Sequence, residues 1–171
     1  MISPQTVDFD DYVVRHRQAL MRLATVLSGQ TWLADDLVAD VLGRAFERWD
    51  RIGAVADPHA YVRRMIVNDY LSWRRRLART TPRAHVEPSE SVSDGAQEHA
   101  ERDAMITRLD ALPPRQRAAV VLRYYVGMSD ADIAAELGCR EITVRSQISR
   151  ALATLRLTLA GDTPVLAQES R

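Results

Sequence analysis

Apolar residues recur every three or four positions along most of this 171-residue chain, and the strict alternation that is typical of a half-exposed β-strand is absent. Three such stripes lie in the first 80 residues and predict helices over 9–27, 31–49 and 57–76. The third helix is expected to begin at Asp57-Pro58, since an N-cap residue followed by proline is a common helix start. The pattern therefore predicts an all-α fold.

A second group of helices is expected after residue 103. Ser129 and Asp132 have the spacing of a capping box, and Gly127 and Gly138 are placed to end the helices that precede them. The predicted helices cover 112–125, 130–137 and 141–157. A short helix, a glycine-containing turn and a longer helix are the outline of a helix-turn-helix unit.

Between these two groups, the segment 80–100 reads TTPRAHVEPSESVSDGAQEHA. It is rich in Pro, Ser, Glu and Gly and has no apolar periodicity, which predicts a flexible, acidic linker. We therefore expect two small helical domains, over 1–79 and 104–160. The linker between them covers 80–103, and a tail covers 161–171.

Charge is unevenly distributed along the chain, although the formal net charge is zero. The net charge is −3, +6, −5, +3 and −1 over 1–50, 51–83, 84–103, 104–156 and 157–171. Two basic blocks separated by an acidic segment indicate two surfaces for a polyanion. Every basic side chain is arginine, which suits phosphate and guanine recognition, although a GC-rich genome would favour arginine codons as well.

The helix predicted over 57–76 carries a candidate nucleic-acid surface. Helical spacing places aromatic, guanidinium and amide groups on one side, at Tyr61, Arg64, Asn68, Ser72 and Arg75. Rings and guanidinium planes stack on exposed bases, and amides hydrogen-bond to base edges. The run Trp73-Arg74-Arg75-Arg76 at the end of the helix strengthens this interpretation.

The helix predicted over 141–157 has two opposite faces. The apolar face, expected in a core, comprises Val144, Ile148, Ala151 and Leu155, and the other face carries Arg145, Ser146, Ser149 and Arg150. Arginine with small hydroxyl side chains is what a helix needs to approach base edges in the major groove. The alternative is a generic three-helix bundle with a solvated basic edge.

Several function classes lack support in the sequence. No apolar run is long enough to span a membrane, and the N-terminus carries acids where a secretory signal would be basic. Cys139 is the only cysteine, so an intrachain disulfide is excluded and a reducing cytoplasm fits. The four histidines are scattered, and no phosphate loop or nucleophile elbow occurs. We expect no enzyme activity, no cofactor and no metal.

Several motifs together carry a family resemblance. MSDADIAAELGCREITVRSQISRALATLR and the preceding LPPRQRAAVVLRYY resemble region 4 of bacterial extracytoplasmic-function (ECF, group 4) sigma factors. DDLVADVLGRAFERW resembles region 2.2 of that family, and DPHAYVRRMIVNDYLSWRRR resembles regions 2.3 and 2.4. The motifs occur in the family's order, and the chain is similar to the short SigE-like factors of actinobacteria. The resemblance implies a sigma-2 domain, a linker and a sigma-4 helix-turn-helix domain.

The resemblance also implies binding sites. Asp36, Asp40 and Glu47 form an acidic line on the 31–49 helix, which by itself could be a solvated face. The resemblance makes this helix a candidate contact to the β′ coiled coil of core RNA polymerase, through Asp36, Leu37, Asp40, Val41 and Arg44. The −10 element would be bound by the loop near 51–59 and by His59, Tyr61, Arg64, Asn68, Trp73, Arg74 and Arg75. The −35 element would be read by Thr143, Arg145, Ser146, Ser149 and Arg150, with the sigma-4 domain on the β flap.

Three residues depart from the family pattern. Arg140 stands where a serine-like helix cap is usual, Gln147 where an arginine is common, and Gly43 where a larger residue is found. The first two leave the −35 sequence open. The sequence also leaves open the target promoters, the inducing signal and whether an anti-sigma factor is a partner.

The main alternative is a stand-alone transcriptional regulator, because the C-terminal unit also resembles LuxR-type output domains. Such regulators usually carry an α/β sensor upstream, whereas the upstream part here is expected to be all-α and basic.

Overall fold

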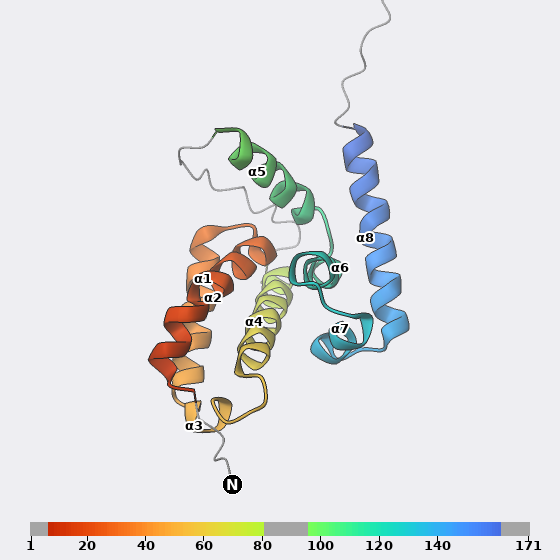
Figure 1. Ribbon diagram of the computed structural model, residues 1–171. Helices are drawn as coiled ribbons and strands as arrows, with labels where there is room; N and C mark the ends of the chain where they lie inside the picture. Colours follow the sequence, from red (N-terminus) through yellow and green to blue (C-terminus); the bar gives the residue numbers. More distant parts are fainter. Residues whose placement is uncertain (1–6, 81–95, 162–171) are drawn as a thin grey trace, which may run out of the picture. The chain divides into compact units, whose positions relative to one another are not determined.

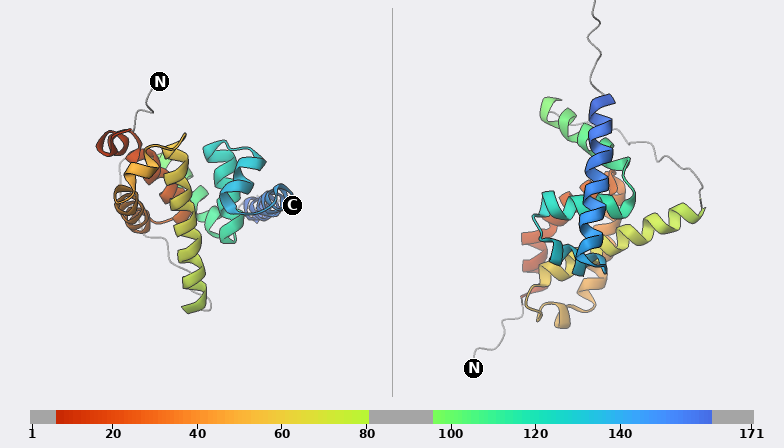
Figure 2. Two further views of the ribbon diagram at one scale, coloured as in Figure 1. Left: turned by 90° about the horizontal axis from the view of Figure 1, so that it is seen from below. Right: turned by 90° about the vertical axis from the view of Figure 1, so that its right-hand side faces the viewer.

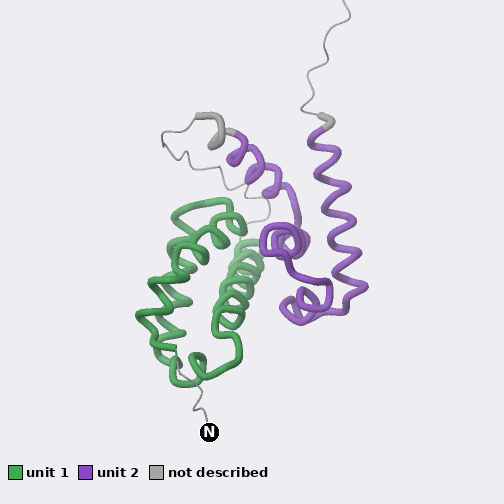
Figure 3. The backbone as a smooth tube through the Cα atoms, in the orientation of Figure 1, with its two compact units in different colours: residues 1–94 green, residues 95–171 purple. Residues whose placement is uncertain are grey.

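The computed structural model describes residues 7–80 and 96–161, with side chains described over 7–80 and 101–159. The chain divides into two compact units, residues 1–94 and 95–171, coloured separately in Figure 3. All secondary structure in the described ranges is helical, as the sequence predicts. No helix in these ranges combines the length and apolar character needed to cross a membrane.

Unit 1 is a bundle of three long helices and one short helix, α1(Phe9–Ser28), α2(Thr31–Phe46), α3(Trp49–Ile52) and α4(Pro58–Thr80), shown in Figure 1. The Asp8 carboxylate caps α1 by accepting hydrogen bonds from the backbone N–H groups of Asp10 and Asp11, at 3.1 and 3.3 Å. Gly29 ends α1 in the left-handed region, with φ 77°, which glycine adopts without a Cβ clash.

The core of unit 1 lies where α1, α2 and α4 pack against one another. Its fully buried aliphatic side chains come from all three helices and include Leu20, Leu27, Val38, Val41, Val62 and Ile66. These residues follow the 3–4 spacing of the sequence, so burial of one face of each helix stabilises the bundle.

The helix predicted over 31–49 is interrupted, and this part of the prediction is wrong. Its regular part ends at Phe46, and a separate turn of helix begins at Trp49. The Trp49 indole donates a hydrogen bond to the carbonyl of Val7 at 2.6 Å, and its ring packs against Phe9 and Tyr12. These contacts with the start of α1 hold Trp49 in the core. The apolar spacing therefore continues although the helix is interrupted between Phe46 and Trp49.

Helix α4 begins as expected, because the Asp57 carboxylate accepts a hydrogen bond from the Ala60 N–H at 2.9 Å. It continues to Thr80, and Figure 2 shows its C-terminal turns extending beyond the other helices of unit 1. The exposed residues Arg75, Arg76 and Arg79 lie on this extension.

Unit 2 comprises α5(Ala96–Asp110), α6(Pro114–Val120), the π-helical segment η1(Val121–Val126), α7(Asp130–Leu137) and α8(Glu141–Gly161). Helix α5 was not predicted, and its first eight residues, 96–103, occupy the end of the expected linker. This stretch contains Ala, Gln, Glu and Arg, which favour helix without any apolar periodicity. The remainder of the linker, 81–95, lies outside the described residues.

The helix-turn-helix is formed by α7 and α8, which pack against each other. The Ser129 hydroxyl accepts a hydrogen bond from the Asp132 N–H at 3.1 Å and caps α7. Gly138 then ends α7 with φ 62°, a conformation that side-chain-bearing residues rarely adopt. The predicted cap, short helix, glycine turn and longer helix are all present.

One charged side chain is part of the unit 2 core. Arg117 of α6 is 1% exposed and forms an ion pair with Asp110 at the end of α5. A buried guanidinium needs partners for its N–H groups, so this pair fixes the end of α5 against α6.

Candidate DNA and polymerase interfaces

The predicted recognition face of α8 is exposed, and its opposite face is buried. Arg145, Ser149 and Arg150 are exposed, whereas Thr143 and Ser146 are half-buried. Val144, Ile148 and Ala151 are buried on the other side of the helix, and Leu155 is half-buried. The five predicted −35 residues therefore lie on the side of α8 that faces away from its buried residues, within its first three turns.

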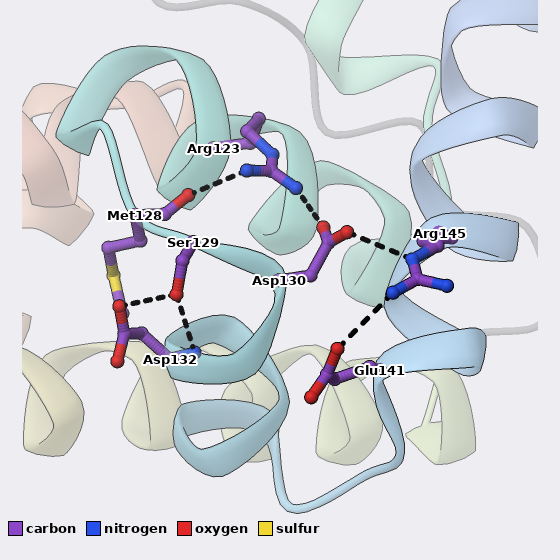
Figure 4. Close-up of polar contacts among 7 residues, drawn as sticks. All are labelled: Arg123, Met128, Ser129, Asp130, Asp132, Glu141 and Arg145. Atoms are coloured by element: carbon purple, nitrogen blue, oxygen red, sulfur yellow. Dashed lines mark hydrogen bonds and ion pairs between the residues drawn. The ribbon is translucent and has the colours of Figure 1, made fainter.

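Arg145 is held by two carboxylates rather than extending freely into solvent (Figure 4). Its Nε donates to Asp130 Oδ2 at 3.1 Å, and its Nη2 donates to Glu141 Oε2 at 3.3 Å. The other oxygen of Asp130 accepts from Arg123 Nη2. Arg123 Nη1 in turn donates to the backbone carbonyl of Met128 at 3.1 Å. A chain of hydrogen bonds thus connects η1, α7 and α8.

An open groove of about 420 Å³ begins at this network and follows α8. Side chains of η1, α7 and α8 line it, namely Arg123, Tyr124, Asp130, Arg145, Ile148, Ser149, Leu152 and Arg156. Three arginines against one aspartate give its rim a positive charge, which favours an anionic ligand over a cationic one.

On α4, the predicted nucleic-acid face is exposed except at Ser72, which is half-buried. Tyr61, which is 44% exposed, lies on this face with the exposed residues Arg64, Asn68 and Arg75. Trp73 and Arg74 are half-buried, and helical spacing places both of them off this face. The structure therefore keeps four predicted residues together and separates two from them.

His59 lies at the start of α4 within a cluster of rings. It stacks on His16 with 4.4 Å between ring centroids and shares a 3.3 Å hydrogen bond with the Tyr12 hydroxyl. Burial lowers the pKa of His59, and the nearby charges of His16 and Arg63 lower it further, whereas Asp57 opposes this shift. Burial also raises the pKa of Tyr12. His59 thus has a packing role in addition to the predicted DNA contact.

The predicted polymerase face of α2 divides into exposed and buried positions. Asp36 and Asp40 are exposed, whereas Leu37 and Val41 are 7% and 0% exposed and belong to the core. Leu37 and Val41 therefore belong to the core of unit 1, and their predicted contact with a partner stays a prediction. The exposed part of the predicted face is made by Asp36 and Asp40, with the partly exposed Arg44 beside them.

Arg44 is a link between two helices of unit 1. It forms ion pairs with Asp40 on its own helix, at 3.3 Å, and with Asp69 on α4. Burial raises the pKa of Asp69, and the Arg44 charge opposes this shift. Arg44 is thus shared between packing and the predicted surface.

Sequence patterns missed two of the acids that hold Arg44 and Arg145. Asp130 is 15 positions before Arg145, and Asp69 is 25 positions after Arg44, so no helical spacing pairs them. Asp40 and Glu141, each four residues before its arginine, have a spacing from which an ion pair could have been inferred.

Two protein families match the chain, one in each unit. Residues 12–80 match Sigma-70 region 2, and residues 102–155 match Sigma-70, region 4. Both halves therefore belong to sigma factors, which does not favour a stand-alone regulator with an unrelated sensor module.

Relatives and solved structures agree with these matches. The RNA polymerase sigma-E factor of Streptomyces avermitilis is 36% identical, with 100% of this chain and 97% of the relative covered. The ECF RNA polymerase sigma factor SigL of Mycobacterium tuberculosis is 33% identical over 84% of each chain. The sigma factor RpoE of Bartonella quintana, solved with the anti-sigma factor NepR, is 27% identical with a TM-score of 0.74, covering 91% of this chain and 98% of that one.

With identity of this extent along its full length and both sigma regions in their normal order, the chain belongs to the SigE-like extracytoplasmic-function sigma factors, which bind core RNA polymerase and direct it to specific promoters.

Proposed function

We propose that the two units divide promoter recognition between them, with α4 binding the −10 element and α8 reading the −35 element. The observation that carries this proposal is that each unit presents one exposed, arginine-bearing helix face. On α4 this face also carries a tyrosine and an amide, which suit unstacked bases, whereas on α8 it carries small hydroxyl groups, which suit a duplex groove.

In unit 1, the loop between α3 and α4, within the predicted range 51–59, takes up an unstacked base of the −10 element. Tyr61, Arg64, Asn68 and Arg75 then follow the melted strand and the adjoining duplex. Trp73 and Arg74 are proposed as further −10 contacts next to this face, although both are half-buried. The exposed acids Asp36 and Asp40 contact the β′ coiled coil of core polymerase, supported from below by the buried part of α2.

In unit 2, Arg145, Ser146, Ser149 and Arg150 approach the −35 base edges, with Thr143 near the helix start, and the unit rests on the β flap. The acidic segment 80–103 connects the two domains through the polymerase cleft towards the RNA exit channel. Residues 81–95 of this segment lie outside the described residues. The path is what the family resemblance implies, and the acidity of the segment fits it.

The protein acts in the cytoplasm, where its polymerase and promoters are, and by binding rather than by catalysis. An anti-sigma factor is proposed as its regulator, because RpoE of Bartonella quintana was solved in complex with the anti-sigma factor NepR. A second similar structure, that of CnrH, was solved with the cytosolic domain of CnrY. Purification of the tagged protein from its own cells tests this part, and recovery of polymerase alone would contradict it.

The promoter proposal is tested by in vitro transcription with core polymerase on genomic fragments, followed by mapping of start sites. We expect transcripts only when protein and core are both present, and shared −10 and −35 sequences upstream of the starts. Core polymerase that initiates equally without the protein would contradict the proposal. So would specific duplex binding by the free protein together with failure to bind core.

A further inference from the structure

We propose that Asp130 is a positioning residue for −35 recognition, which holds the guanidinium of Arg145 so that its terminal nitrogens are left for a base edge. The inference rests on the proposed function of α8 as the −35 reader. It adds to that function a residue outside α8, Asp130, which connects Arg145 to Arg123 of η1 through hydrogen bonds.

The first support is that Asp130 is itself fixed. Its side chain is 21% exposed, and its two oxygens are engaged separately, Oδ1 by Arg123 and Oδ2 by Arg145 Nε at 3.1 Å. Arg123 is anchored by a 3.1 Å hydrogen bond to the backbone carbonyl of Met128, just after η1. Asp130 also begins α7, where the helix dipole favours a carboxylate. Arg145 is therefore held by a carboxylate, that of Asp130, which is itself fixed in place.

The second support is the choice of nitrogen. An arginine guanidinium has one N–H on Nε and two on each terminal nitrogen. Asp130 takes the Nε–H, which points back along the side chain, and leaves Nη1 without a partner among the described residues. A bidentate contact to the O6 and N7 atoms of guanine can be made end-on by Nη1 and Nη2. The Asp130 bond therefore orients the fork without occupying both of its terminal nitrogens.

Glu141 has the opposite relation to the base. It accepts from Nη2 of Arg145 at 3.3 Å, which is one of the two nitrogens that an end-on contact requires. Its side chain is exposed, and this i,i+4 pair is a weak surface interaction that salt screens. Base binding would compete with Glu141 but not with Asp130. The two acids should therefore differ in the effect of their removal.

The experiment measures transcription by holoenzyme, reconstituted from core polymerase and the full chain, on every single-base variant of the −35 element. The variants are Asp130→Ala, Asp130→Asn, Arg145→Ala, the Asp130→Ala/Arg145→Ala double variant, Glu141→Gln and Asp132→Ala. Asp132 is the matched control, since it lies in the same first turn with the same charge but bonds to Ser129 instead of Arg145. Thermal unfolding of each free variant is recorded in parallel.

We expect Arg145→Ala to remove the preference for one −35 base, and Asp130→Ala to reduce the preference at that same position about tenfold, the scale of one charge-assisted hydrogen bond. The double variant should match Arg145→Ala, because Asp130 acts only through Arg145. Asp130→Asn keeps an acceptor oxygen and should retain an intermediate preference. Asp132→Ala should affect all −35 variants equally, and Glu141→Gln should leave the preference unchanged or sharpen it.

A uniform loss across all −35 variants for Asp130→Ala, or a change at a different position from Arg145→Ala, would overturn the inference and leave a structural role. If Asp130→Ala does not fold, the same comparison is made with Asp130→Asn, and an unchanged profile there overturns the inference. A parent protein that initiates with core but shows no −35 preference contradicts the proposed function itself. A parent with a clear preference that Asp130→Ala retains contradicts only the role of Asp130.

Discussion

Arginine supplies all of the basic side-chain charge of this chain, and several of these residues act as links within a unit. Arg44 joins Asp40 to Asp69, and Arg145 joins two acids of the helix-turn-helix. A planar fork with several fixed donors can hold two carboxylates at once, whereas a lysine ammonium is a point charge on a flexible stem. Codon bias is therefore not the only reason for arginine at these positions.

At the same scale, the His59 cluster makes the stability of unit 1 depend on pH. Burial lowers the pKa of His59 in the folded protein, so the unfolded chain binds its proton more readily. The free energy of unfolding should then fall as the pH drops through the ordinary histidine pKa of about 6.5 and on towards the lower folded pKa. Exchange of His59 for Gln should reduce this slope, because the group that titrates is removed.

The measurement is urea unfolding at several pH values between about 7.5 and 5.5, followed by tryptophan fluorescence. All three tryptophans, Trp32, Trp49 and Trp73, lie in unit 1, so the signal reports on that unit. Arg63 and Asp57 act on the pKa of His59 with opposite signs. Equal slopes for parent and His59→Gln would show that burial of this ring is not linked to protonation.

At the scale of elements, sequence periodicity located the long helices but not the places where tertiary contacts change the backbone. Helix α1 and both helices of the helix-turn-helix follow from caps and apolar spacing. The break before Trp49 depends on a hydrogen bond to Val7, and the π-helical turns of η1 continue a helix whose pattern looks regular. Neither leaves a local signal in the sequence.

For the candidate interfaces as well, the sequence predicted which helix faces are exposed but not the contacts made by tertiary packing. Helical spacing placed Arg145 on the exposed face of α8 and Tyr61 on that of α4. It could not show that Val41 is fully buried, because an apolar residue beside an acid fits both a core and an interface. It also could not find Asp130, since an ion pair across 15 residues is created by the packing of α7 and α8.

Helix α2 offers a test of its regularity at Gly43. A Cβ built there has no neighbouring atom within 4 Å, and the residue lies inside the helix. Gly43→Ala should therefore raise the free energy of unfolding of unit 1 by about 0.5–1 kcal/mol, because alanine loses less backbone entropy. Urea unfolding with tryptophan fluorescence measures the change.

The matched control is Gly53→Ala, where a Cβ would lie 2.9 Å from the Trp49 indole nitrogen and 3.1 Å from the Val7 carbonyl oxygen. That substitution should destabilise unit 1, since the Val7 backbone and the packed indole must move. A loss of stability in Gly43→Ala as well would mean that α2 is not a regular helix at this position.

The acidic face of α2 provides the second test at this scale. Asp36→Ala/Asp40→Ala should leave the unfolding midpoint nearly unchanged, because the Asp40–Arg44 pair is exposed and of the i,i+4 kind, which contributes about 0.3–0.5 kcal/mol. Affinity for core polymerase should fall by about tenfold or more if the pair is at the centre of the contact. Fluorescence anisotropy of labelled protein titrated with core measures this.

Asp35→Ala is the control for the acidic pair, since Asp35 is exposed on the same helix but faces a different direction. It should lower affinity much less than the double variant. If the double variant binds core as tightly as the parent, Asp36 and Asp40 form only a solvated face, which the sequence alone also allowed.

At the scale of the whole molecule, a net charge of zero conceals a segregated distribution. The two basic blocks, 51–83 and 104–156, carry the proposed DNA faces, and the segment 84–103 between them has a net charge of −5. An acidic segment covalently attached to both blocks lowers the effective attraction of the free chain for phosphate. If polymerase binds the segment 84–103, the segment no longer repels the DNA phosphates. Both DNA faces would then be available to one promoter.

The free protein should therefore bind duplex DNA only weakly, within the range of about 10⁻⁴–10⁻⁶ M that is typical of non-specific binding at physiological salt. Anisotropy of a labelled promoter duplex measures this, with and without core polymerase, at several salt concentrations. Replacement of Glu87, Glu90 and Asp94 by their amides should tighten binding of the free chain to all sequences alike, because only phosphate attraction changes. Added core polymerase should make binding sequence-specific. A tight, specific footprint by the free parent at physiological salt would show that the acidic segment does not shield the basic faces.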